Sequence, residues 1–218
     1  MDKPILFSGN MVQAIIEGRK TQTRRVIKPQ PNLYRNNPEI LEWKEKNLIC
    51  NGPRDGLVAN NPFGKPGGVI WVRETWAVWG QFKNGAGYCY RADGDLALQW
   101  RPSIFMPREA CRITLKVINV RVEQVQEITD ADCYSEGIQD IGKGVGCLNG
   151  KYGMAKTLYA ELWNSINAKR GYSWQSNPWV WVIEFKPESV ARSAQQGNAG
   201  DAASGALIKQ TLSGEVSG

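Results

Sequence analysis

Histidine is absent from the 218-residue sequence. It is the commonest general base near neutral pH and the commonest metal ligand of proteins. Its absence excludes Ser-His-Asp and Cys-His catalysis and histidine-bound zinc. Any catalysis must therefore use lysine, carboxylates, hydroxyl groups, tyrosine or cysteine. We expect neither a metal ion nor a cofactor.

Paired cysteines and long apolar runs are missing too. No two of the five cysteines have the CxxC spacing, and an odd number favours free thiols in a reducing compartment over a disulfide framework. No apolar run approaches the roughly 20 residues of a membrane span. The opening MDKPILFSGN lacks the basic and apolar regions of a secretory signal. We expect a cytoplasmic protein with no membrane partner.

Basic residues exceed acidic ones by 27 to 21, which gives a net charge of +6 and a pI near 9.1. This excess of positive charge favours anionic partners such as nucleotides or RNA, although a basic protein without such a partner can have the same excess.

Nine tryptophans are present. Most are expected in core packing, and a few are candidates for stacking on bases.

Apolar periodicity predicts an α+β fold. Helices are expected at 11–17, 129–136 and 156–167, and strands at 69–74, 88–93, 111–125 and 177–186. The apolar residues change parity between Val117 and Ile118, which predicts a β-bulge of the kind that turns corners in small barrels. Segments 27–68 and 142–153, rich in Gly, Asn or Pro, are expected to be irregular. Residues 187–218 lack aromatics and are predicted to form a disordered tail.

The segment EGRKTQTRR, residues 17–25, concentrates chemistry at the end of the first helix. Lys20 and Thr23 are three residues apart, so a turn places both on one side. Arg19, Arg24 and Arg25 disfavour a further positive charge and should lower the pKa of an exposed cleft lysine. Such a lysine can act as a general base towards a hydroxyl group. The alternative is a solvated basic run that complements the helix dipole.

Four segments together resemble the ASCH family. They are ILFSGNMVQAIIEGRKTQTRRV, GGVIWVRETW, ITDADCYSEGI and WVWVIEF, in an ordered series over about residues 4–186. The resemblance, strongest to phage and prophage members, implies a PUA-like small mixed β-barrel with flanking helices over residues 1–186. It places insertions near 27–66 and 77–108. It also implies an association with RNA or modified nucleosides, in the host cytoplasm if a phage encodes the chain.

A compact bacterial branch of that family hydrolyses N(4)-acetylcytidine without a metal ion, through the motif GRKTxTxR and a glutamate after the central strands. The matching residues here are Lys20, Thr23 and Glu136, the last at the negative end of a predicted helix dipole. This chain is about twice as long, and its insertions bear on the shape of the cleft. The resemblance therefore implies an amidohydrolase whose partner is a modified nucleoside.

Substrate contacts are expected from seven further residues, with the two tryptophans stacking at the cleft mouth: Arg19, Arg24, Arg25, Arg73, Glu74, Trp76 and Trp79. A non-catalytic module that binds RNA or nucleotides is the alternative function. An ASCH-type ribonuclease is another. A role in phage particle assembly is a fourth, which no particular residue supports.

Overall fold

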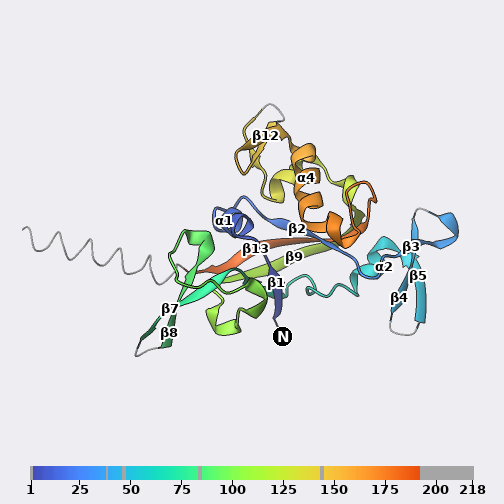
Figure 1. Cartoon of the computed structure of the whole chain (residues 1–218). Coiled ribbons are helices and arrows are strands. Elements are labelled where there is room, and N and C mark those ends of the chain that lie inside the picture. The colour runs from blue at the N-terminus through green and yellow to red at the C-terminus, as the bar shows by residue number, and fades with distance from the viewer. Residues whose placement is uncertain (1, 38, 46–47, 83–84, 143–144, 192–218) are drawn as a thin grey trace, which may run out of the picture.

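The computed structural model describes residues 2–37, 39–45, 48–82, 85–142 and 145–191. Its centre is a mixed five-stranded sheet (Figure 1). In spatial order the strands are β1 (Lys3–Leu6), β6 (Val69–Arg73), β9 (Ile113–Gln124), β13 (Trp179–Val190) and β2 (Gln22–Val26). The β1–β6 pair is parallel and the other pairs are antiparallel. The α+β prediction is confirmed, and within the described ranges this sheet is open, with β1 and β2 as its edges.

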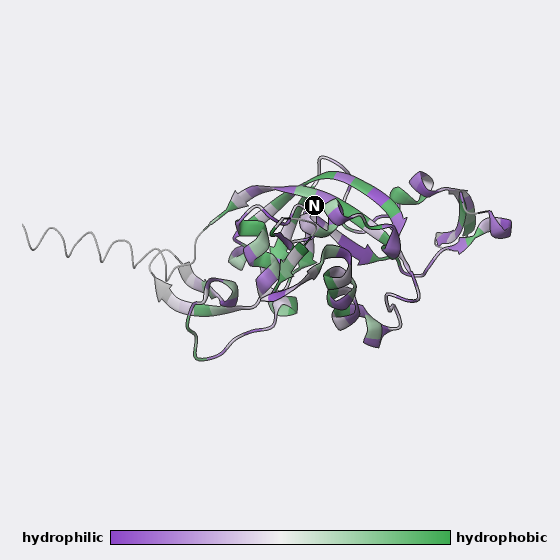
Figure 2. Cartoon of the chain, turned by 90° about the horizontal axis from the view of Figure 1, so that it is seen from above, coloured by the Kyte–Doolittle hydropathy of each residue, from purple (hydrophilic) through white to green (hydrophobic). Residues whose placement is uncertain are grey.

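The central strand β13 is apolar on both faces because both faces of the sheet are covered. Trp181, Ile183 and Phe185 enter the larger core, together with residues of α1 and β9. Val180 and Val182 point to the opposite face and pack with residues of α3 and α4. Apolar residues gather along this middle layer in Figure 2. The strand expected at 177–186 is therefore present as β13, and it is buried on both faces.

A β-bulge lies in β9 where the apolar pattern changes parity. Val117 pairs with Phe185 and Asn119 pairs with Glu184, so Ile118 has no partner of its own across the ladder. Its side chain is 47% exposed, whereas Val117 and Val120 are buried. The extra residue returns the later apolar side chains to the core, as the sequence predicted.

The central sheet is flanked by α1 (Gly9–Ile16), α3 (Asp130–Ser135) and α4 (Ala155–Asn167), and Leu57 of the short helix α2 (Arg54–Val58) also joins its core. Gly18 follows the end of α1 with a φ of 75°, which suits glycine at a helix C-terminus. The hydroxyl of Thr129 accepts a hydrogen bond from the Asp132 amide, and the Asp132 carboxylate accepts one from the Thr129 amide. The glycine after α1 fixes the end of that helix that meets the site below, and the Thr129–Asp132 cap fixes the start of α3.

Both segments predicted to be irregular contain small antiparallel sheets, so that prediction is wrong. The first holds β3 (Asn32–Leu33), β4 (Ile40–Glu45), β5 (Leu48–Pro53) and the short helix α2 (Arg54–Val58); the second holds β11 (Val145–Leu148) and β12 (Lys151–Met154), next to β10 (Gln139–Asp140). Such hairpins are held by local backbone pairing. Leu48 and Ile49 are 70% and 72% exposed, so little alternating burial is written into the sequence.

The remaining elements are a hairpin and single 3₁₀ turns. The hairpin is β7 (Trp76–Phe82) with β8 (Gly85–Tyr90), and it projects from the opposite end of the molecule to the β3–β4–β5 sheet (Figure 1). The 3₁₀ turns are Tyr34–Asn36, Arg91–Asp93, Ser103–Phe105, Arg108–Ala110, Val125–Glu127 and Ala168–Arg170.

Strand β13 continues past the predicted domain end at residue 186. Val190 pairs with Ile113, and the hydroxyl groups of Ser189 and Thr114 lie 2.8 Å apart. The folded domain therefore includes the first residues of the segment predicted to be a tail. The rest of that segment, 192–218, lies outside the described residues. No helix in the described part is both long and apolar enough to span a membrane.

Candidate active site

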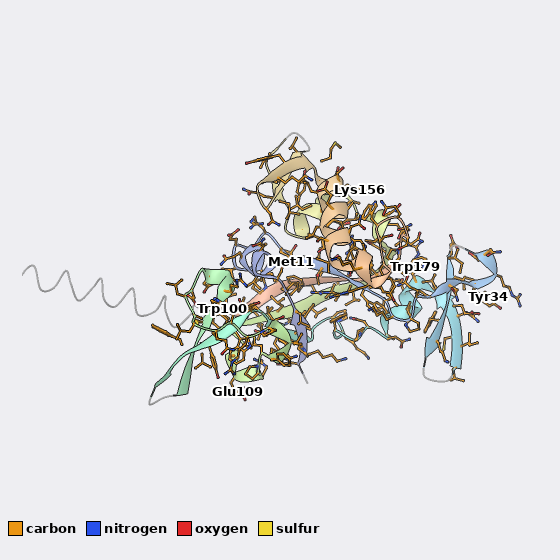
Figure 3. The ribbon with its side chains drawn as sticks, in the orientation of Figure 1. Met11, Tyr34, Trp100, Glu109, Lys156 and Trp179 are labelled. Atoms are coloured by element: carbon orange, nitrogen blue, oxygen red, sulfur yellow. The ribbon has the colours of Figure 1, made fainter. Side chains whose placement is uncertain are left out.

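Two cavities meet beside the end of α3. The main cavity, of about 640 Å³, is lined by residues of β2, β4, α2 and α4, and the side cavity, of about 330 Å³, by residues of α1 and β11 and the residues after α3. Met11, Glu136 and Leu162 line both. Met11 is labelled on α1 in Figure 3. Glu136 therefore stands where the two cavities join.

Lys20 is held against the end of α3 by its backbone and by its side chain. Its amide donates to the Ala14 carbonyl at 2.9 Å, and the next amide, of Thr21, donates to the Ser135 carbonyl at 2.8 Å. The ammonium group donates to the backbone carbonyl of Glu136 and to its carboxylate Oε2, each at 2.7 Å. The Lys20 side chain is 0% exposed and that of Glu136 is 4% exposed. The structure thus pairs two of the three predicted catalytic residues inside the protein.

Gly137 makes this close approach possible. Its φ of +106° lies in the region that favours glycine. A Cβ atom at this position would lie 3.2 Å from the Cβ of Ala14 and 3.5 Å from the Cβ of Lys20. Only the first distance is tighter than an ordinary contact, so a larger residue would press on Ala14, whose carbonyl holds the Lys20 amide.

The buried position of Lys20 corrects the expectation of an exposed cleft lysine. Burial lowers the pKa of Lys20, Glu136 opposes the shift, and Arg25 and Arg24 add to it. The predicted direction is therefore confirmed. Its main cause is loss of solvation rather than the neighbouring arginines.

Arg24 connects the pair to a network of charges on the same face of the sheet. Its guanidinium donates to Glu136 Oε1 at 3.3 Å, to Glu123 at 3.0 Å and to Asp132 at 3.1 Å. Arg121 bonds Asp132 at 3.0 Å and also Glu123. Arg24 thus fixes the second oxygen of the Glu136 carboxylate, while Lys20 holds the first.

Asp132 anchors this network at low pH. Burial alone would raise its pKa, but hydrogen bonds from the Gln22 amide and the Thr129 amide, with the charge of Arg24, hold it at about 2. Gln22 Nε2 lies 2.9 Å from Asp132 Oδ1. Gln22 and Arg24 alternate on β2, so both reach the α3 face.

Thr23 lies on the other face of β2 and lines the main cavity together with Glu136. It pairs with Ile183 of β13 and is 3% exposed. Its hydroxyl group makes no hydrogen bond to any other residue that the structure describes. The structure therefore brings all three predicted catalytic residues to one region and leaves this hydroxyl group without an acceptor or donor there.

The two other arginines of the motif lie on different cavities. Arg19 lines the side cavity, where it donates to the Gly137 carbonyl at 2.9 Å and pairs with Glu17. Arg25 lines the main cavity; it donates to the Leu6 carbonyl at 2.6 Å. Both residues line a cavity, and their contact with a substrate stays a prediction.

Four predicted substrate contacts lie elsewhere, because β6 is separated from β2 by β9 and β13. Glu74 is buried in a two-bond pair with Arg112, at 2.9 and 3.0 Å. Trp76 is 4% exposed and packs in a separate core cluster, so its ring is covered. Arg73 lies over the Trp71 ring. Neither cavity is lined by Arg73, Glu74, Trp76 or Trp79.

Sequence reasoning missed Tyr159, which lines the main cavity and is 3% exposed. Burial, with the charge of Glu136, raises its pKa well above the ordinary value. Its phenol is therefore a neutral hydrogen-bond donor. It follows Leu158 in the apolar stripe of α4, so nothing in the sequence pattern distinguished it from core residues.

Among the described residues, no group of His, Cys, Asp and Glu is arranged to hold a metal ion.

No protein-family model matches the sequence, and no curated protein matches it. Among solved structures, the fold is similar to the crystal structure of protein EF3133 from Enterococcus faecalis V583, which is described with the family model DUF984. The TM-score is 0.43 at 9% sequence identity, over 88% of this chain and 82% of that chain. A similarity at this level assigns neither a family nor a function, and the resemblance to the ASCH family stays a prediction.

Proposed function

We propose that the protein is a metal-independent amidohydrolase that removes the acyl group from a modified nucleoside such as N(4)-acetylcytidine. The observation that carries the proposal is the buried Lys20–Glu136 pair beside the cavity that Thr23 lines. Lys20 Nζ lies 2.7 Å from Glu136 Oε2, and Thr23 and Glu136 line the same cavity. This arrangement supports the assignment of a base, a nucleophile and a proton donor for acyl transfer.

The buried Lys20–Glu136 pair supplies the base. Transfer of one proton along their 2.7 Å hydrogen bond converts the ion pair into a neutral amine and a carboxylic acid. Burial favours this neutral form of the lysine. The amine then takes the proton of the Thr23 hydroxyl group as the oxygen attacks the acyl carbon.

Glu136 completes the first half of the reaction. As the tetrahedral intermediate collapses, the carboxylic acid gives its proton to the departing amide nitrogen, which leaves as the free amine of cytidine. Lys20 is again an ammonium group and Glu136 a carboxylate, and the acyl group is an ester of Thr23. No charge has been gained or lost.

A water molecule completes the cycle. Glu136 takes a proton from the water as its oxygen attacks the ester, and Lys20 returns a proton to the departing Thr23 oxygen. The proton that Glu136 gained then passes back to Lys20, which restores the ion pair and releases the carboxylic acid. The neutral phenol of Tyr159 is a donor in the main cavity that suits the oxyanion of both steps.

The test is turnover of a panel of acylated nucleosides, with products read by mass spectrometry. The wild type is expected to release cytidine and acetate in equal amounts from N(4)-acetylcytidine. Lys20→Met, Thr23→Val and Glu136→Gln should each remove most of that turnover, and the double variants should lose little more, because the three residues act as a unit. Wild-type rates in the single variants would refute the assignment.

The alternative is a binding module for nucleotides or RNA that has no catalysis. One observation favours this alternative. Both hydrogen bonds of the Lys20 ammonium group go to Glu136, as they would in an ion pair that has only a structural role. In that case no acylated nucleoside is turned over, RNA binds with a strong salt dependence, and Lys20→Met and Arg24→Ala both weaken the binding. RNA cleavage in the same assay would instead indicate a ribonuclease.

A further inference from the structure

Four cations line the main cavity without a carboxylate partner among the described residues: Arg25, Lys28, Lys44 and Arg170. Arg24, in contrast, contacts three carboxylates. Glu136 is the acidic residue of the same lining, and it is already bound by Lys20 and Arg24. The wall of the main cavity therefore carries an excess of positive charge that no neighbouring side chain neutralises.

These cations come from three segments that are distant in the sequence. Arg25 belongs to β2, and Lys28 follows that strand. Arg170 ends the 3₁₀ turn after α4, and Lys44 belongs to β4. Convergence of like charges from separate elements costs free energy unless an anion lies between them. A surface that merely keeps the protein soluble would not need to collect them in one hollow.

Arg25 is the cation whose setting departs most from a solvated surface. Its guanidinium donates to the Leu6 carbonyl at 2.6 Å and lies 5.0 Å from the Phe7 ring centroid. Burial lowers its pKa, and Arg170 adds to that shift, while Glu136 and Tyr159 oppose it. Arg25 and Arg170 thus repel one another across the cavity that both of them line.

The rest of the lining suits a nucleobase. Trp43 and Tyr172 line the main cavity and are partly exposed, and aromatic faces stack on bases. Trp163 and Trp181 also line it, but both are buried in the core. Lys28 Nζ lies 5.1 Å from the centroid of the Tyr172 ring, which puts a cation beside one of the partly exposed rings. The volume of about 640 Å³ is within the range of roughly 300–1,000 Å³ that is typical of small-molecule sites.

We propose that the main cavity takes a nucleoside monophosphate, with the phosphate held by Arg25, Lys28 and Arg170, and that the preferred substrate is an acylated nucleotide rather than the neutral nucleoside. This inference rests on the proposed function for the chemistry, but the phosphate site does not depend on turnover. Arginine binds phosphate through paired N–H donors, and lysine as a point charge. A cavity of this size fits a mononucleotide better than a long RNA.

The first experiment compares kcat/KM for N(4)-acetylcytidine, its 5′-monophosphate, its 3′-monophosphate and a short acetylated oligoribonucleotide. One monophosphate should exceed the nucleoside by about tenfold or more, as expected for hydrogen bonds to a charged group. Arg170→Gln and Lys28→Gln should each lower that preference by at least about fivefold, mainly through KM. Lys116→Gln is the matched control, because Lys116 is exposed and lines neither cavity.

The second experiment measures binding of cytidine and cytidine monophosphate to the wild type by calorimetry. Tighter binding of the monophosphate, lost in Arg170→Gln and retained in Lys116→Gln, supports the phosphate site even if no acylated compound is hydrolysed. Hydrolysis with equal preference for nucleoside and nucleotide overturns the inference and leaves the proposed function intact. A preference for the oligonucleotide over both monophosphates overturns it in favour of RNA.

Discussion

Replacing Lys20 by methionine should unfold the protein at lower temperature as well as remove its activity. Methionine keeps much of the apolar stem of lysine but has no charge. The Glu136 carboxylate then loses the ammonium group at 2.7 Å while it stays 4% exposed. A buried carboxylate without its partner is the source of the expected loss.

The size of the effect follows from burial. Removing one partner of a buried ion pair costs about 3–5 kcal/mol. Arg24 still donates to the other oxygen of Glu136 at 3.3 Å, which favours the lower end of that range, about 3 kcal/mol. For a domain of this size that corresponds to a drop in Tm of about 6–12 °C. An exposed cleft lysine would give a change below about 1 kcal/mol.

The assay is urea and thermal unfolding, followed by tryptophan fluorescence, of the wild type, Lys20→Met and the exposed control Lys116→Met. Lys20→Met combined with Glu136→Gln should be more stable than Lys20→Met alone, because the second change removes a buried charge that has lost its ammonium partner. A Tm within 2 °C of the wild type for Lys20→Met, or a double variant less stable than the single, would contradict the buried pair.

Three further outcomes are expected. The pKa of Asp132 falls from 3.8 to about 2 on folding, so the stability that its charge contributes is full above about pH 4 and is lost as the pH falls to 2. In acid unfolding curves, the stability difference between the wild type and Asp132→Asn should therefore shrink over that pH window. A constant difference would argue against the network. Gly137→Ala should lower the free energy of unfolding by about 1–3 kcal/mol and should also reduce turnover. Gly64→Ala is the control, because Gly64 has a similar φ of +112° but no atom within 4 Å of the added Cβ, and this variant should lower only stability. Equal turnover in the two variants would exclude the contact with Lys20. Thr23→Val should lower kcat by at least about 10²-fold, while its Tm stays within about 3 °C of the wild type. Thr23→Ser keeps a hydroxyl group and should retain part of kcat. Full activity in Thr23→Val would exclude Thr23 as the nucleophile.

Three of the five central strands, β6, β9 and β13, could be predicted from the sequence because they are buried on one or both faces. The alternation in β9 and the continuous apolar run in β13 record where the core lies, and the parity change beside Ile118 records the bulge. The edge strands β1 and β2 were not predicted, and β2 forms where a turn was expected between Lys20 and Thr23. The small sheets at 32–53 and 139–154 could not be predicted in the same way. Their strands depend on backbone pairing, and exposed residues such as Leu48 and Ile49 leave no periodic signal.

The candidate site was predicted in part. Spacing and resemblance identified Lys20, Thr23 and Glu136 as candidates. How deeply these side chains are buried depends on how the end of α1 packs against the end of α3. No local sequence pattern encodes that packing. Trp76 was assigned to the cleft because it follows a predicted strand. Trp76 instead begins β7, in a separate hairpin that follows β6, and β9 and β13 lie between β6 and β2. Strand order is a long-range property.

The most direct test of the proposed function is a single-turnover reaction of the wild type with N(4)-acetylcytidine and with its 5′-monophosphate, quenched and analysed by mass spectrometry of the intact protein. The mechanism predicts that an acetyl group appears transiently on Thr23 and decays at the rate at which acetate is released. The acetyl adduct should be absent in Thr23→Val and in Lys20→Met. Release of acetate by the wild type with no adduct, or with undiminished rate in Thr23→Val, would contradict it.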